Sequence, residues 1–258
     1  MTATNTEVIC LAKAARLTTA VIQDAIQEAS PLQVAFLQQV LEAEVASRTR
    51  SKITRLTKTA GFPMHKSLTG FDWTRTTLPT GLDASDLSDA DFVNRLENLV
   101  LMGDVGTGKT HLACAIGHAA CHKGMKVKFT TVAHLVLDLT KAAQSGVLDK
   151  HMNALSKLDL LILDEFGYIP MGIDQARLLF QVIADAYENT SVVITTNLPF
   201  ARWGDILADT QMAAALIERV IHHGHLISFE GSSWRLEHSL MRQGGRHPNL
   251  TTNTNQNK

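Results

Sequence analysis

The sequence predicts an α/β protein in which a mostly parallel sheet is covered by helices on both faces, preceded by a small all-helical N-terminal domain. From residue 98 onward, five short apolar runs alternate with helical segments. The runs are apolar at consecutive positions, as in strands buried on both faces of a parallel sheet. Helices between such strands imply right-handed crossovers and three layers. The expected strands are residues 99–102, 127–131, 158–163, 192–195 and 226–229.

Residues 1–66 are expected to form the helical N-terminal domain, because they contain no strand-like run. Pro31 is suited to the first turn of a helix, where its missing N–H is not needed. Apolar residues then recur at helical spacing, which predicts an amphipathic helix. They are Leu32, Ala35, Phe36, Leu37, Val40, Leu41 and Val45.

Residues 67–243 are expected to form the sheet domain, with 67–97 as a connecting segment that Gly70, Pro79 and Gly81 punctuate. Residues 244–258 are polar and rich in Asn, Thr and Gln, which predicts a disordered tail. With 258 residues, of which 45% are hydrophobic, the chain can build one sizeable core and a small appendage.

Charge and cysteine content exclude several classes of protein. The formal net charge of −1 predicts no partner by itself. Three cysteines without paired spacing argue against a disulfide framework and fit a reducing compartment. No apolar stretch is long enough to span a bilayer, and the first residues lack the pattern of a signal peptide. We therefore expect a cytoplasmic protein that does not contact membranes.

Residues 103–110 read GDVGTGKT, the pattern of a phosphate-binding loop, between an expected strand and a helix-forming run. Glycines allow the backbone angles that place successive N–H groups around an anion. The helix that starts at Lys109 directs its positive dipole end at the phosphates. This arrangement predicts ATP binding. The expected nucleotide-binding residues are Gly103, Asp104, Val105, Gly106, Thr107, Gly108, Lys109, Thr110 and His111.

Two acids complete the expected site from another strand. We expect Lys109 to bridge the β- and γ-phosphates and the Thr110 hydroxyl to ligate Mg²⁺. The apolar run that ends in Asp164 and Glu165 delivers carboxylates to the carboxyl edge of the sheet. Asp164 is expected to hold Mg²⁺, and Glu165 to act as the general base on water. The alternative is that both acids cap the next segment.

A third expected strand ends in Asn197, whose amide is placed to orient the attacking water beside Glu165. The alternative is an Asn that caps a turn before Pro199.

Four segments, taken in order, resemble the IstB-like ATPases: GDVGTGKTHLACAIG, LDLLILDEFGYIP, SVVITTNLPFARWGD and ALIERVIHHGHLI. The likeness covers roughly residues 32–237. These ATPases are helper proteins of insertion-sequence transposition and relatives of the helicase loader DnaC within the AAA+ superfamily. The resemblance implies a P-loop NTPase domain of the AAA+ (ASCE) type. Because only 29 residues follow Phe229, the helical lid is expected to be reduced or absent.

The resemblance also implies roles for two arginines. Arg219 matches the arginine finger, which reaches the γ-phosphate held by a neighbouring subunit and implies a homo-oligomer with ATP at the subunit interface. A surface arginine paired with an acid on its own helix is the alternative. Arg235 matches the second sensor of the γ-phosphate, with a solvent-exposed arginine as the alternative.

A run of basic residues without acids precedes the connecting segment, in residues 46–66. Spacings of four, three and three place four of them along one stripe of a helix. Such a stripe suits phosphate contacts, and the resemblance implies duplex DNA bound with little sequence preference. A solvated helix face is the alternative. The expected DNA-binding residues are Arg48, Arg50, Lys52, Arg55 and Lys58.

Together these observations predict an ATPase that assembles on duplex DNA and assists a DDE-type transposase, with hydrolysis releasing or remodelling the assembly. Two alternatives remain open at this stage. One is a replicative helicase loader of the DnaC type, and the other is an ATP-binding assembly switch that barely hydrolyses ATP.

Overall fold

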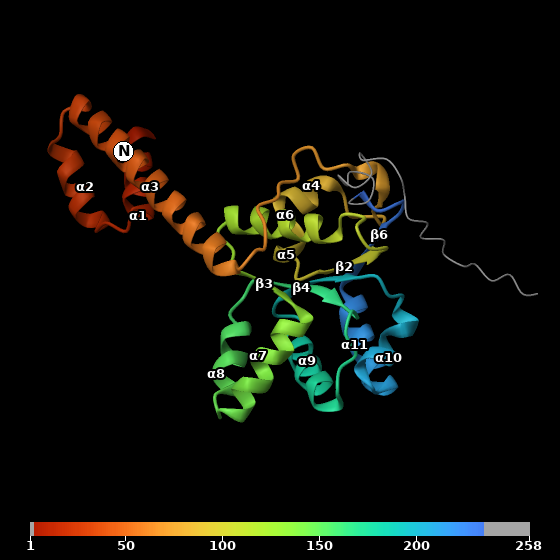
Figure 1. Ribbon diagram of the computed structural model, residues 1–258. Coiled ribbons are helices and arrows are strands. Elements are labelled where there is room, and N and C mark those ends of the chain that lie inside the picture. The colour runs from red at the N-terminus through yellow and green to blue at the C-terminus, as the bar shows by residue number, and fades with distance from the viewer. Residues whose placement is uncertain (1–2, 235–258) are drawn as a thin grey trace, which may run out of the picture. The chain divides into compact units, whose positions relative to one another are not determined.

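The computed structural model describes residues 3–234, which form two compact units divided between Thr59 and Ala60. Figure 1 shows the helices of the first unit and the layered second unit. None of the helices in residues 3–234 is long and apolar enough to cross a bilayer. The predicted disordered tail, residues 244–258, lies outside the described residues.

The first unit consists of α1 (Ala3–Ala14), α2 (Thr19–Glu28) and most of α3 (Pro31–Ala60). A small core holds it together, formed by Val8, Ala12, Ala15, Ile26, Val34 and Leu41. The predicted apolar stripe of α3 only partly faces this core. Leu32, Phe36 and Val40 are exposed, because the seven apolar residues cover more of the helix surface than two short helices can bury.

The second unit is built on a six-stranded sheet in the order β1-β6-β2-β5-β4-β3. All neighbours pair in parallel except β1 with β6. The three-layer α/β fold predicted from the sequence, with helices preceding it, is thereby confirmed. The strands are β1 (Thr76–Thr77), β2 (Asn98–Gly103), β3 (Val127–Thr131), β4 (Leu160–Phe166), β5 (Ser191–Thr196) and β6 (Gly224–Phe229).

Helices cover both faces of the sheet (Figure 1). One face carries α4 (Ala84–Asp89), α5 (Asp91–Asn94) and α6 (Lys109–His122). The other carries α7 (Val132–Gln144), α8 (Leu148–Leu155), α9 (Ile173–Ala186), α10 (Trp203–Leu207) and α11 (Thr210–His222). Two short 3₁₀ turns, η1 (Trp73–Arg75) and η2 (Phe200–Arg202), lie in the connections.

Strand β4 differs from its prediction at both ends. It begins at Leu160 because the N–H of Leu158 is used in a turn, donating to the carbonyl of Leu155. It continues through Phe166, which is fully buried against Trp203 with ring centroids 4.1 Å apart. Both acids of the expected site therefore belong to the strand itself.

Residues 60–66, which the sequence assigned to the helical domain, lie in the second unit. Phe62 packs on α6, with its ring centroid 4.2 Å from that of His118. Gly117 of α6 leaves room for this contact, because a Cβ there would lie 2.4 Å from the Phe62 ring.

The order of the strands determines which residues can form a common site. β5 lies between β2, which leads into the glycine-rich loop, and β4, which carries the two acids. The carboxyl ends of these three parallel strands meet at one edge of the sheet. Residues that follow β2, β4 and β5 are therefore brought together.

At the amino ends of the parallel strands, the buried polar residue Asn98, which begins β2, connects this strand to its neighbours. Its Nδ2 donates to the carbonyl of Val220 on α11 at 3.3 Å, and its Oδ1 accepts from the N–H of Val192 on β5 at 2.8 Å. One side chain thus links two strands and a helix in the core.

Replacing Asn98 should destabilise the second unit. Asn98→Ala leaves the Val192 N–H and the Val220 carbonyl without their partner in a buried place, at a cost of about 3 kcal/mol in the free energy of unfolding. Urea unfolding followed by circular dichroism measures this change. The exposed Asn94→Ala should stay within about 0.5 kcal/mol of wild type, and equal stability of both variants would contradict the proposed link.

Candidate nucleotide site

The loop between β2 and α6 wraps around its own lysine. Lys109 is only 6% exposed, and its Nζ donates to the carbonyls of Gly103 at 2.8 Å and Asp104 at 2.7 Å. The Thr107 hydroxyl also donates to the carbonyl of Asp104, at 2.8 Å. An ammonium group therefore lies inside the loop at the start of α6, where phosphate oxygens are attracted.

Two glycines of the loop are required by geometry. Gly106 has φ +82°, and a Cβ there would lie 2.1 Å from Oγ of Ser233. At Gly103 a Cβ would lie 2.4 Å from the carbonyl oxygen of Phe229. The loop thus combines left-handed backbone with close approach to the segment that follows β6, and both features exclude larger residues.

Asp164 joins three elements at the carboxyl edge of the sheet. The Thr110 hydroxyl of α6 lies 3.0 Å from its Oδ1 and 3.2 Å from its Oδ2, and the Thr195 hydroxyl of β5 donates to Oδ1 at 2.5 Å. Asp164 is buried, with 5% of the residue exposed. A hydroxyl and a carboxylate in contact form a donor set that suits Mg²⁺, which prefers oxygen and few protein ligands.

A bulge in β4 separates the environments of the two acids. Leu163 pairs with Ile194 and Phe166 with Thr196, so that Asp164 and Glu165 together oppose the single residue Thr195. Glu165 adopts φ +61°, and its N–H donates to the Thr195 hydroxyl at 3.0 Å. Bulges of this kind redirect side chains. Here the bulge buries Asp164 and leaves Glu165 exposed.

Asn197 follows β5 directly and is half-buried. Its Oδ1 is buried and has no hydrogen-bond partner within residues 3–234. Because buried amide oxygens normally accept a hydrogen bond, this atom is an open acceptor beside the acid strand.

The predicted nucleotide-binding residue His111 lies against the connecting segment. Its Nε2 is 3.4 Å from the carbonyl of Ser67, and its ring centroid is 5.4 Å from that of Phe71. Burial lowers the pKa of His111, so the imidazole is neutral near pH 7. Phe71 also packs on Trp73 and approaches Gly108, which places an aromatic pair beside the loop.

The segment after β6 lies over the glycine-rich loop. The N–H of Trp234 donates to the carbonyl of Gly106 at 3.0 Å, and Arg75 Nη1 donates to the carbonyl of Ser232 at 3.3 Å. Sequence reasoning missed this contact, as it missed Thr195 and Phe71. The expected sensor, Arg235, is the next residue and lies outside the described part of the chain.

Arg219 is not brought to this site within its own chain. It adjoins Val220, whose carbonyl contacts Asn98 at the first residue of β2, whereas the loop follows the last residue of that strand. Six strand residues span roughly 20 Å. Arg219 Nη1 donates to the carbonyl of Ala215 at 2.8 Å, and the guanidinium carbon lies 5.0 Å from the Phe180 ring centroid.

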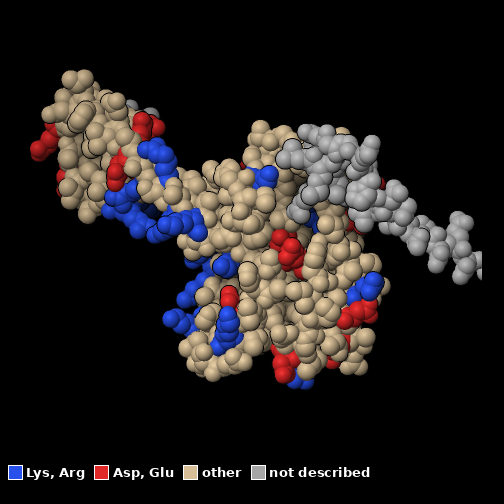
Figure 2. Space-filling model, viewed as in Figure 1, with Lys and Arg blue, Asp and Glu red and all other residues tan. Residues whose placement is uncertain are grey.

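The predicted basic stripe lies on the second half of α3, and all of its members are exposed. Arg48 forms an ion pair with Glu44 at 2.6 Å. Figure 2 shows the basic residues gathered along this helix. The stripe comprises Arg48, Lys52, Arg55 and Lys58, and the fifth expected DNA-binding residue, Arg50, lies on the same helix.

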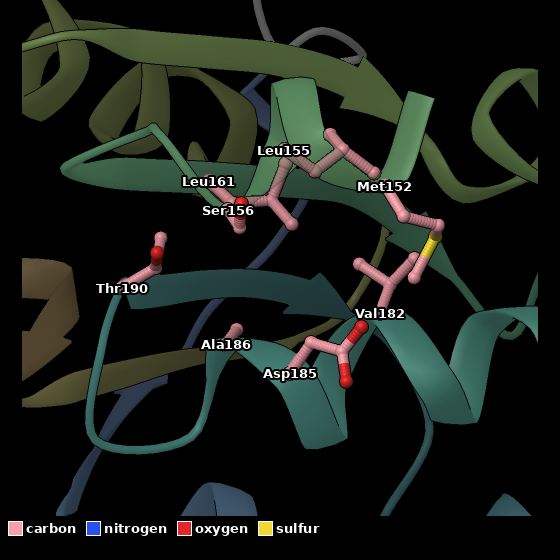
Figure 3. A pocket seen from close by; sticks show the side chains of 8 residues that line it. All are labelled: Met152, Leu155, Ser156, Leu161, Val182, Asp185, Ala186 and Thr190. Carbon is pink, nitrogen blue, oxygen red and sulfur yellow. The ribbon is translucent and has the colours of Figure 1, made fainter. Parts of the chain in front are cut away.

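A small cavity lies elsewhere, between α8, α9 and the adjoining strands (Figure 3). It measures about 10 Å³, enough for at most a single water molecule. Met152, Leu155 and Val182 point into it from the helices, and Asp185 lies at its rim. This cavity is therefore too small for a nucleotide and is unrelated to the site at the carboxyl edge.

Comparisons with known proteins show which family the chain resembles. The model of the family described as "IstB-like ATP binding protein" matches residues 4–242. A protein of Geobacillus stearothermophilus, named as an ATP-binding protein of insertion sequence IS5376, is 36% identical over 81% of this chain and 83% of its own. One from Pseudomonas aeruginosa, named for IS21, is 37% identical over 78% and 76%.

Solved structures show a similar fold. The crystal structure of DnaI has a TM-score of 0.51 at 19% identity, covering 64% of this chain and 92% of that one. The replication initiator DnaA, bound to AMPPCP and single-stranded DNA, has a TM-score of 0.53 at 16% identity, covering 67% and 52%. At these identities the likeness concerns the fold alone.

Proposed function

The chain belongs to the family of IstB-like ATP-binding proteins, and we propose on this basis that it is an ATPase that assembles on duplex DNA and assists the transposase of an insertion sequence. The observation that carries the proposal is the convergence of Lys109, Thr110, Asp164 and Thr195 at one edge of the sheet. Relatives named for insertion sequences point to a transposase as the partner.

ATP is proposed to bind with its triphosphate in the loop at residues 103–110. When ATP binds, Lys109 Nζ would stop donating to the carbonyls of Gly103 and Asp104 and would donate to phosphate oxygens instead. Charged phosphate oxygens form stronger hydrogen bonds with an ammonium group than neutral carbonyls do. His111, whose ring packs against Phe71, is proposed to contact the part of the nucleotide outside the loop. Thr110 and Asp164 would hold Mg²⁺, which neutralises charge on the phosphates.

Hydrolysis requires a base with access to water, and the bulge of β4 supplies it. Glu165 is exposed, and Thr195 fixes its backbone through the N–H. We propose that its carboxylate accepts the proton of the attacking water, while the open Oδ1 of Asn197 orients that water. Asp164 stays buried, in contact with two hydroxyl groups.

Arg219 lies at the edge of the sheet opposite to the loop, so any action on the γ-phosphate must come from a neighbouring subunit. We propose that Arg219 supplies this charge in trans, within a homo-oligomer that DNA organises. Arg235 is proposed as the sensor within the same subunit. The first 66 residues are proposed to carry the DNA contacts, through the stripe on α3.

The site is tested by two variants with different expected defects. Lys109→Ala should abolish ATP binding, whereas Glu165→Gln should bind ATP and hydrolyse it at least about 100-fold more slowly, since only the base is lost. Nucleotide binding by fluorescent analogue and phosphate release measure the two steps. Glu28→Gln, an exposed residue of α2, is the control. Wild-type hydrolysis by Glu165→Gln would refute the assignment.

The action of Arg219 in trans is tested by mixing two inactive variants. Arg219→Ala keeps Glu165, and Glu165→Gln keeps Arg219. At equal amounts, about a quarter of the head-to-tail contacts should join an intact site to an intact arginine, so part of the ATPase activity returns. Steady-state hydrolysis of the mixture, compared with each variant alone, measures this recovery. No recovery in a mixture that co-assembles contradicts the proposal.

The stripe on α3 is tested by charge reversal. Changing Arg48, Lys52 and Arg55 to Glu should abolish binding to duplex DNA and leave basal ATPase activity intact, because phosphate contacts are lost while the nucleotide site is untouched. A salt-titrated gel shift measures affinity. Reversal of three exposed cations elsewhere, Lys13, Arg177 and Arg202, is the control. Unchanged affinity of the stripe variant would show that the stripe is a solvated face.

A further inference from the structure

The basic residues of the second unit include two groups that differ in their ion pairing. One group is neutralised by ion pairs with nearby acids: Arg75–Asp72, Arg95–Asp86, Lys123–Asp89, Arg177–Asp174 and Arg202–Asp205. Their N–O distances range from 2.7 Å for Lys123 to 3.8 Å for Arg75. Each of these cations has an acid beside it, which reduces the net charge of its surroundings.

A second group gathers at one flank of the sheet and forms no ion pair with any described residue. It consists of Lys126, Lys128, Lys150 and Lys157, which we call the lysine flank. Lys126, Lys150 and Lys157 are exposed, and Lys128 is half-buried. Figure 2 shows basic residues over α8 and the adjoining edge of the sheet.

The backbone brings these four lysines together from separate parts of the sequence. Lys128 lies on β3, the edge strand, and Lys126 precedes that strand directly. The carbonyl of Lys126 accepts from the N–H groups of Asp159 at 2.9 Å and Leu160 at 3.2 Å, which places Lys157 nearby. Lys150 lies on α8, the helix that ends two residues before Lys157.

The acids of this flank do not neutralise it. The Asp159 carboxylate accepts the N–H of Lys126 at 2.6 Å and so serves the backbone. Asp149 lies in the first turn of α8, where it stabilises the helix dipole. Counting both acids, four lysines and two aspartates still leave a formal charge of +2.

Protection of the edge strand explains only part of this pattern. Lysines on an edge strand discourage pairing with another chain, which accounts for Lys126 and Lys128. Lys150 and Lys157 lie off the strand, on α8 and in the turn after it, and gain nothing from that role. A positive surface across several elements calls for an anionic partner.

We propose that the lysine flank is a second binding surface for the phosphate backbone of duplex DNA, on the ATPase unit itself and distinct from the stripe on α3. The proposal rests on the proposed function, in which DNA is the ligand. Lysine is depleted at protein–protein interfaces, which argues against an acidic protein as the partner. As a point charge without the bidentate geometry of arginine, lysine suits contact with phosphates irrespective of sequence.

The inference has a measurable consequence in the dependence of affinity on salt. Each phosphate neutralised by the protein adds about 0.9 to the slope of log affinity against log salt concentration. If only α3 contacted DNA, neutralising the flank would leave the slope unchanged. If both surfaces bind, each contributes its own share.

The test uses the full chain with Lys126, Lys150 and Lys157 changed to Gln, and a duplex of random sequence as the probe. The slope should fall by roughly 2–3, with at least about a tenfold loss of affinity at moderate salt. Basal ATPase activity and the circular dichroism spectrum should match wild type. The matched control neutralises three ion-paired cations, Lys123, Arg177 and Arg202, and should leave the slope unchanged.

The possible outcomes separate the two proposals. If wild type binds duplex DNA and the flank variant shows the same slope, the flank is not a DNA surface, although the proposed function survives. If the flank variant keeps its DNA slope but loses binding to the transposase, the surface belongs to a protein partner and the inference is overturned. If wild type binds no DNA, the proposed function itself fails.

Discussion

The carboxylate of Asp164 is the point on which the rest of the site depends. It receives a hydroxyl from the first turn of α6 and another from β5 while belonging to β4. A buried charge is tolerated only when such partners hold it, because the low-dielectric interior penalises an isolated ion. One carboxylate therefore fixes the positions of β4, β5 and the start of α6 relative to one another. Thr195 extends this arrangement to Glu165 through the bulge.

Much of this organisation could be predicted from the sequence, because its signals are local. Consecutive apolar residues marked the parallel strands, and the spacing of Gly103, Gly106 and Gly108 marked a loop between a strand and a helix. The link between Asp164 and Thr110 was anticipated only as a shared metal site. A strand ending in an acid had to end at the same edge as the loop, since all parallel strands share one polarity.

Other features depended on contacts that no local pattern encodes. In the sequence Thr195 looks like any β-branched residue of a strand. Only the order of the strands shows that it lies beside Asp164. The exposure of Phe36 followed from how little surface α1 and α2 cover. Ser233 approaches Gly106 although the two residues are more than 100 positions apart in the sequence. Taken separately, each looks like a turn residue, so the sequence does not reveal the contact. Long-range packing decided these details.

The polarity of the sheet bears on how activity would scale with assembly size. The loop lies at one edge and Arg219 at the other, so copies that share catalytic groups must stack with a direction. An open stack then has one terminal pocket without an incoming arginine, whereas a closed ring has none. Turnover per subunit would rise with stack length and reach its ceiling only on closure. Under the proposed function, the length of DNA that organises the copies would thereby set the specific ATPase activity.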